Sequence, residues 1–171
     1  GLCAHYSEAP WDFINDWGVT YDPRKLETGE DPVMPFVLFP KQVDWCRYVV
    51  DKWKNKQPGL TEKSRDSGIS WLAICLGATL CLFNPGFAAG YGSAVQDLVD
   101  EVGNPKSLFW KARFFLKELP REFRGGWDEN RHAPYMRILF PNGSSMIGES
   151  GDQIGRGNRT SIFFLDESAH L

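Results

Sequence analysis

The fold is decided by the stretch Lys63-Ser64-Arg65-Asp66-Ser67-Gly68-Ile69-Ser70, residues 63–70. A short strand is predicted through Leu60 and Thr61 before it, and an apolar helix over 69–83 after it. A loop that leads from a strand into a helix presents free backbone amides at the helix N-terminus, where they bind anions. The stretch therefore predicts a phosphate-binding loop.

The match to the phosphate-loop pattern G-x-x-x-x-G-K-[ST] is partial. Gly68 and Ser70 fit its second glycine and its hydroxyl residue, whereas Ile69 occupies the lysine position and Lys63 the first glycine position. The chemistry requires a cation near the phosphates, a hydroxyl for Mg²⁺ and free amides. Lys63 supplies that cation from the start of the loop, with Arg65 as a second candidate. The alternative is a polar turn in which Ser70 is an ordinary early-helix residue.

A second stretch, Ser161-Ile162-Phe163-Phe164-Leu165-Asp166-Glu167, is an apolar run that ends in two acids. The run predicts a strand over 161–165 that is buried on both faces. Side chains alternate along a strand, so the two acids take different positions. We expect Asp166 to hold Mg²⁺ and Glu167 to activate the attacking water. The alternative is a strand end followed by a solvated acidic turn.

The loop 63–70 and the acids Asp166 and Glu167 each follow a predicted strand. Open α/β sheets bind ligands at the carboxyl ends of their strands. The Asn142-Gly143 pair between apolar runs predicts a hairpin. Ser93 is predicted to cap the helix that begins at Ala94. Alternating strands and helices indicate an α/β layer fold. Beyond the elements already named, helices are predicted over 40–55, 94–101 and 106–119, and strands over 87–91, 136–140 and 144–147.

The composition fits a globular protein. The chain has 171 residues, 42% hydrophobic residues and a formal charge of -3, so no overall basic field indicates nucleic-acid binding. No apolar run is long enough for a membrane span. Residues 1–35 are predicted to be an irregular acidic and aromatic lead-in with one short helix around Trp11–Trp17, and its Trp and Phe side chains are expected to pack onto the main domain, 36–171. The polar, glycine-containing stretch 121–134 is predicted to be a surface loop. The cysteines, of which Cys46 and Cys75 lie in apolar helical patterns, are predicted to be free thiols rather than disulfides or zinc ligands.

Four segments together resemble the ATPase domain of the large terminase subunits of tailed bacteriophages. Residues 63–70 resemble that family's variant Walker A loop, in which the lysine moves to the front. Phe39-Pro40-Lys41-Gln42 resembles its adenine-recognising glutamine motif, and 162–167 its Walker B strand with the catalytic glutamate. Gly155-Arg156-Gly157 resembles the segment that carries an arginine directed at a neighbouring subunit's ATP.

This resemblance implies a three-layer αβα P-loop NTPase of the additional-strand catalytic-glutamate type, with a mostly parallel sheet and with ATP and Mg²⁺ bound. The catalytic residues would be Glu167 and Arg156, with Arg159 in reserve, and the metal ligands Ser70 and Asp166. Gln42 would bind adenine; alternatively it is a surface residue, and Arg156 a turn residue. The nucleotide-binding set is Gln42, Lys63, Ser64, Arg65, Asp66, Ser67, Gly68, Ile69 and Ser70.

The resemblance also implies a role and partners. The expected partners are double-stranded DNA, further copies in a ring, a portal protein and a small terminase subunit, with no membrane. The expected location is the host cytoplasm, docked on the procapsid. The chain ends four residues after Glu167, so we expect a fragment without nuclease activity. Alternatives are another P-loop translocase or helicase-like ATPase, and a nucleotide-free structural or interaction domain.

A basic stretch is the last candidate surface. It is either a face for DNA or a neighbouring subunit, or a solvated helix face. Its members are Lys106, Lys111, Arg113, Lys117, Arg121 and Arg124.

Overall fold

The computed structural model describes residues 2–57, 69–93, 95–151 and 160–165. They form a mixed α/β fold around a four-stranded sheet of order β4-β5-β3-β6. The strands are β3 (Ala88–Ser93), β4 (Arg137–Leu139), β5 (Ser145–Ser150) and β6 (Ile162–Leu165). Strand β3 pairs in parallel with β5 and β6, and only β4 is antiparallel. The prediction of an α/β fold with a mostly parallel sheet is therefore confirmed.

Helix α4 (Ile69–Phe83) forms the centre of the core, at the bounds that the apolar run predicts. It is apolar all round because it is covered on every side, and its residues from Leu72 to Cys81 are buried. Near its start, the Ala73 carbonyl accepts a 2.8 Å hydrogen bond from the Tyr91 hydroxyl on β3. Near its end, Cys81 Sγ lies 3.4 Å from the Ser145 carbonyl at the start of β5. Helix α4 therefore runs antiparallel to the parallel strands.

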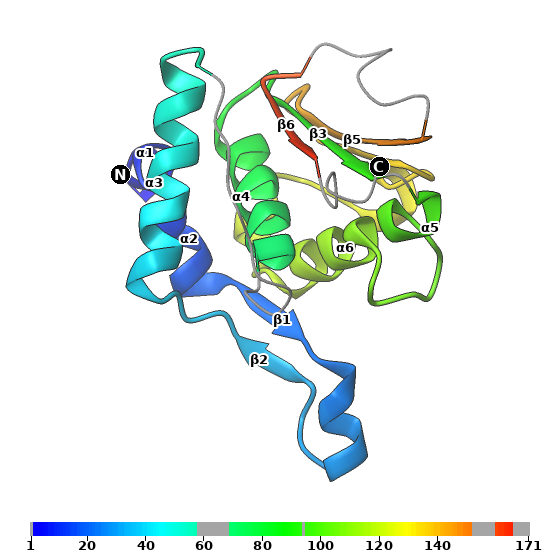
Figure 1. Cartoon of the computed structure of the whole chain (residues 1–171). Helices are drawn as coiled ribbons and strands as arrows, with labels where there is room; N and C mark the ends of the chain where they lie inside the picture. The colour runs from blue at the N-terminus through cyan, green and yellow to red at the C-terminus, as the bar shows by residue number, and fades with distance from the viewer. Residues whose placement is uncertain (1, 58–68, 94, 152–159, 166–171) are drawn as a thin grey trace.

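One face of the sheet is covered by helices α4, α5 (Gln96–Val99) and α6 (Leu108–Glu118), as Figure 1 shows for α4 and α6. The Tyr91 ring connects two of them, since its hydroxyl reaches α4 and its ring lies 6.0 Å from the Phe109 ring on α6. These helices and the sheet make two layers. The second helical layer of a three-layer fold stays a prediction.

The N-terminal region is more regular than the predicted irregular lead-in. It forms α1 (Leu2–Glu8), α2 (Pro10–Trp17), and an antiparallel pair of β1 (Val19–Tyr21) and β2 (Val33–Pro35) that flanks the 3-10 helix η1 (Pro23–Thr28). Phe13 and Ile14 on α2 are fully buried in the main core, so this region packs onto the domain through its apolar residues as expected. The segment between β1 and β2 extends away from the rest of the molecule (Figure 1), whereas the Tyr21 ring on β1 packs against Trp110 and Phe114 of α6.

Several predicted elements are confirmed with shifted ends. Helix α3 spans Pro40–Lys54, α6 lies within the predicted 106–119, and β4 and β5 form the antiparallel hairpin around Asn142-Gly143. The stretch 121–134, predicted as a loop, holds η2 (Arg121–Phe123) and α7 (Glu129–His132). In the described ranges, no helix is long and apolar enough to cross a membrane.

Two details of the prediction are wrong. The helix after β3 starts at Gln96, and Val95 rather than Ser93 precedes it, because Ser93 completes the strand and is fully buried. Strand β6 is half-buried rather than buried on both faces, and Leu165 is 45% exposed. The reason is its position, since β6 ends the order of the described strands and pairs on one side only within that set.

Candidate functional site at the carboxyl edge of the sheet

The carboxyl ends of β3, β5 and β6 form one edge of the sheet. In the register of these strands, Gly92 pairs with Glu149 on one side and with Leu165 on the other, so the strands end side by side. Helix α4 runs antiparallel to them and therefore begins at this same edge (Figure 1). The edge thus combines a helix N-terminus with parallel strand ends, and this arrangement favours anion binding.

Two predicted nucleotide-binding residues, Ile69 and Ser70, form the first turn of α4. Both are half-buried. The remaining loop residues, Lys63–Gly68, lie outside the described residues, as do Arg156, Arg159, Asp166 and Glu167. In the sequence, Gly68 of the predicted loop directly precedes the first residue of α4, and Asp166 directly follows the last residue of β6.

Helix α3 brings Gln42 toward this edge. Its Trp45 ring lies 6.1 Å from the Phe164 ring near the end of β6, whereas its Trp53 ring lies 4.8 Å from Phe87 before β3. The N-terminal end of α3 is therefore the end closer to the carboxyl edge. Gln42 Oε1 accepts a 2.8 Å hydrogen bond from the Phe39 amide, which satisfies one free donor at the start of the helix. The described role of Gln42 is thus helix capping, and adenine binding stays a prediction.

Sequence reasoning missed two buried polar residues at the same edge. Glu149 on β5 is 6% exposed and Ser93 on β3 is fully buried. Carboxylates are seldom buried in strands unless they have a partner, so Glu149 belongs to the polar interior of this edge. The sequence contained a signal for Glu149. Side chains alternate along a strand, so Glu149 lies on the same face as the apolar Ile147 two residues before it. The strand was predicted to stop at Ile147, and this prediction left Glu149 out.

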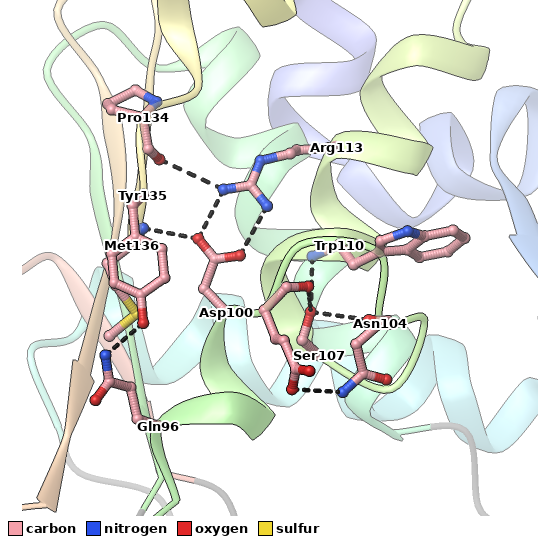
Figure 2. Close-up of polar contacts among 10 residues, drawn as sticks. Gln96, Asp100, Asn104, Ser107, Trp110, Arg113, Pro134, Tyr135 and Met136 are labelled. Carbon is pink, nitrogen blue, oxygen red and sulfur yellow. Dashed lines mark hydrogen bonds and ion pairs between the residues drawn. The ribbon is translucent and has the colours of Figure 1, made fainter.

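A second polar cluster, drawn in Figure 2, lies between α5, α6 and the segment before β4. The Asp100 carboxylate is fully buried and accepts bonds of 2.8 and 2.7 Å from the two terminal nitrogens of Arg113. It also accepts a 2.7 Å bond from the Met136 amide, whose residue has a positive φ of 63°. The carboxylate therefore binds Arg113 and holds a backbone conformation that side-chain-bearing residues rarely adopt.

This cluster corrects the interpretation of Arg113. The sequence placed it on a basic face, either solvated or directed at a partner. In the structure its side chain is 15% exposed and is bonded to Asp100, so Arg113 is an internal structural residue. Next to it, Ser107 Oγ accepts a 3.3 Å bond from the Trp110 amide and caps α6 (Figure 2).

Three of the four cysteines, Cys46, Cys75 and Cys81, are buried. Burial raises the pKa of Cys46 and of Cys81 to about 12, and raises the pKa of Cys75 well above its ordinary value. All four cysteines are free thiols, of which only Cys3 is exposed. A protonated, inaccessible thiol is a poor nucleophile, so Cys46, Cys75 and Cys81 are core residues without nucleophilic chemistry. The prediction that the cysteines are free thiols is confirmed.

The chain was compared with known proteins. No protein-family model matches it, and no curated protein matches it. The functional assignment therefore depends on the residues and on the geometry of the carboxyl edge.

Proposed function

We propose that this protein hydrolyses ATP at the carboxyl edge of its sheet. One observation carries the proposal. The N-terminus of α4 and the carboxyl ends of three strands meet at one edge, and the segments that enter and leave this edge carry the two predicted motifs. Helix N-terminal amides favour a bound phosphate, and open α/β sheets bind ligands beside the carboxyl ends of their strands.

Each residue has a distinct role in this proposal. Lys63 neutralises the β- and γ-phosphates from the start of the loop, and the amides of 64–69 bind their oxygens. Glu167 orients the attacking water and accepts its proton. Arg156 contributes positive charge toward the transferred phosphoryl group, in the same or a neighbouring subunit.

The proposal includes a magnesium ion bound together with the nucleotide. Among the described residues, no group of three His, Cys, Asp or Glu residues forms an all-protein metal cage. Magnesium bound with a nucleotide needs no such cage, because it keeps water and phosphate ligands and takes only one or two protein groups. The Ser70 hydroxyl and the Asp166 carboxylate would be these two groups. The ion supplies charge neutralisation on the phosphates when it is bound.

The motor role is a further part of the proposal, and the sequence resemblance supports it. A large terminase subunit couples ATP hydrolysis to movement of double-stranded DNA into a procapsid, as a ring that works with a portal protein and a small subunit. The residues that carry this part are the displaced Lys63 and the Arg156 segment. We expect the protein to act in the host cytoplasm, without a membrane.

The direct test is ATP binding by calorimetry and phosphate release, with Lys63→Ala, Ser70→Ala and Glu167→Ala variants. Loss of Lys63 should weaken binding roughly tenfold or more, since a charge-assisted contact contributes about 1.5–3 kcal/mol. Glu167→Ala should bind ATP normally and release phosphate at least roughly a hundredfold more slowly. The matched control is Lys54→Ala, an exposed lysine at the far end of α3.

The outcomes separate the candidate functions. Absence of ATP binding to the unmodified protein would support a nucleotide-free structural or interaction domain. Full turnover by Lys63→Ala would move the phosphate cation to another residue, with Arg65 as the next to test. Stimulation of turnover by double-stranded DNA supports a motor, and a helicase-like translocase would show strand separation in the same assay.

A further inference from the structure

A basic cavity lies at the opposite edge of the sheet from the proposed nucleotide site. It has a volume of about 440 Å³ and is formed where α6 ends, by η2 and the start of α7. Besides Gly126, the residues that line it are Lys117, Arg121, Arg124, Trp127, Asp128 and Glu129. A Cβ added at the neighbouring Gly125 would lie 3.3 Å from Leu82 near the end of α4, and one at Gly126 would lie 3.4 Å from Pro141 before β5. The basic cavity is therefore at the amino edge of the parallel strands.

Trp127, one of the residues that line the basic cavity, carries an unsatisfied donor. Trp127 is 4% exposed, and its indole Nε1 is the one buried side-chain nitrogen or oxygen in the described part of the chain that has no hydrogen-bond partner. A buried donor without a partner costs about 1–3 kcal/mol. The Nε1 atom has almost no accessible surface, so a bound acceptor removes this cost when the Trp127 side chain turns its N–H toward the cavity.

The charges of the cavity leave one arginine uncommitted. Glu129 pairs with Lys117 at 3.3 Å, and the Asp128 carboxylate accepts a 3.0 Å bond from the Asn130 amide at the start of α7. Arg124 donates to the carbonyls of Lys117 and Leu119 and so satisfies the C-terminal end of α6. Arg121 is exposed, and its guanidinium has no ion pair or hydrogen bond among the described residues.

The chemistry of these groups indicates an anionic ligand with several oxygens. An arginine guanidinium presents a planar fork of donors that matches two oxygens of one phosphate group. A neutral indole N–H can donate to a third oxygen without adding charge. The Arg124 guanidinium keeps its positive charge while it bonds to carbonyls, and this charge favours the same ligand.

We propose that the basic cavity binds a phosphate group, with Arg121 as the charged contact and the Trp127 indole N–H as a hydrogen-bond donor. This site is separate from the proposed nucleotide site and does not depend on it. The phosphate group has two possible sources, a free phosphate and the backbone of a nucleic acid. The experiment distinguishes them.

The test follows the indole N–H signals of the ¹⁵N-labelled 171-residue chain by NMR, without ATP or Mg²⁺. The Trp127 signal is assigned by its loss in Trp127→Phe. Sodium phosphate is then added at constant ionic strength, and a short DNA duplex is added in a separate titration. The Trp127 signal should shift in a saturable manner. Arg121→Ala should weaken the binding roughly tenfold, as expected for loss of one charge-assisted contact.

The matched control is Arg24→Ala, which removes an arginine with an 81% exposed side chain in the N-terminal hairpin and should leave the binding unchanged. Saturation by phosphate alone identifies a free phosphate group, and saturation by duplex alone identifies a nucleic-acid backbone; either supports the site. Absence of a shift in both titrations, or equal binding by Arg121→Ala, overturns it. The titrations are repeated with Ser70→Ala, so that failure of the nucleotide site is seen separately.

Discussion

The Asp100–Arg113 cluster and the basic cavity both contain arginines of the α6 region, yet they differ in one respect. Arg113 lies within α6, whereas Arg121 and Arg124 come after it. In the cluster, a fully buried carboxylate accepts three hydrogen bonds of 2.7–2.8 Å (Figure 2). In the basic cavity, the buried Trp127 N–H has no partner among the described residues. Buried polar groups whose hydrogen bonds are satisfied within the chain maintain the fold. A buried polar group without a partner can instead gain its hydrogen bond from a ligand. The same residue types therefore serve structure at one place and binding at the other.

The largest expected effect is loss of stability on breaking the cluster. Asp100→Ala removes the partner of Arg113 and leaves the Met136 amide without its acceptor. The free energy of unfolding should fall by about 3–5 kcal/mol, because one charge of a buried pair stays uncompensated. Urea denaturation measures this loss. Asp97→Ala, on the exposed face of α5, is the control; an equal loss in both variants would contradict the role given to Asp100.

The contact between α4 and β3, called the seam below, is a second place where a buried polar group has its hydrogen-bond partner within the chain. A Cβ at Gly77 would lie 1.8 Å from the Tyr91 hydroxyl, which donates to the Ala73 carbonyl. Gly77→Ala should therefore lower the free energy of unfolding by about 1–3 kcal/mol, in spite of the better helix propensity of alanine. Combining it with Tyr91→Phe, which removes the clashing oxygen, should recover part of the loss. If Gly77→Ala is as stable as the parent protein, the seam is looser than described.

A smaller effect is expected at the unsatisfied donor. Trp127→Phe deletes an N–H that has no partner, so the free energy of unfolding should change by less than about 1 kcal/mol, or rise. Trp17→Phe is the matched comparison, because the Trp17 indole donates a 3.0 Å bond to the Tyr6 hydroxyl. The loss in Trp17→Phe should exceed that in Trp127→Phe by about 1 kcal/mol. The reverse order in thermal or urea denaturation would show that the Trp127 donor is satisfied.

The smallest effect concerns the thiols, three of which are buried in the core. Cys3 should react quickly with Ellman's reagent at pH 8, and the three buried cysteines only on unfolding. The folded-state pKa of Cys46 and Cys81 is raised from 9.0 to about 12. Their contribution to stability is therefore intact below pH 9.0 and is lost as the pH rises toward 12. Rapid labelling of a second cysteine in the folded protein would contradict this burial.

Prediction from sequence was successful where the signal is local. The apolar run gave the bounds of α4, and Asn142-Gly143 marked the hairpin, because periodicity and turn chemistry depend on neighbouring residues. In the N-terminal region the short helix around Trp11–Trp17 is confirmed by α2, whereas α1, η1 and the strands β1 and β2 were not predicted. Pro10 and Pro23 occupy first-turn helix positions there. At the candidate site, only Gln42, Ile69 and Ser70 can be compared with described residues.

The sequence by itself determined the order of helices and strands and the two motifs that predict an ATPase, because these depend on spacing along the chain. Only the tertiary structure decided that Arg113 is an internal ion-pair residue while Arg121 stays uncommitted at a cavity. The physical reason is that burial and hydrogen-bond satisfaction depend on contacts between distant segments. Asp100 and Met136 are 36 residues apart, and no local pattern records that one completes the other.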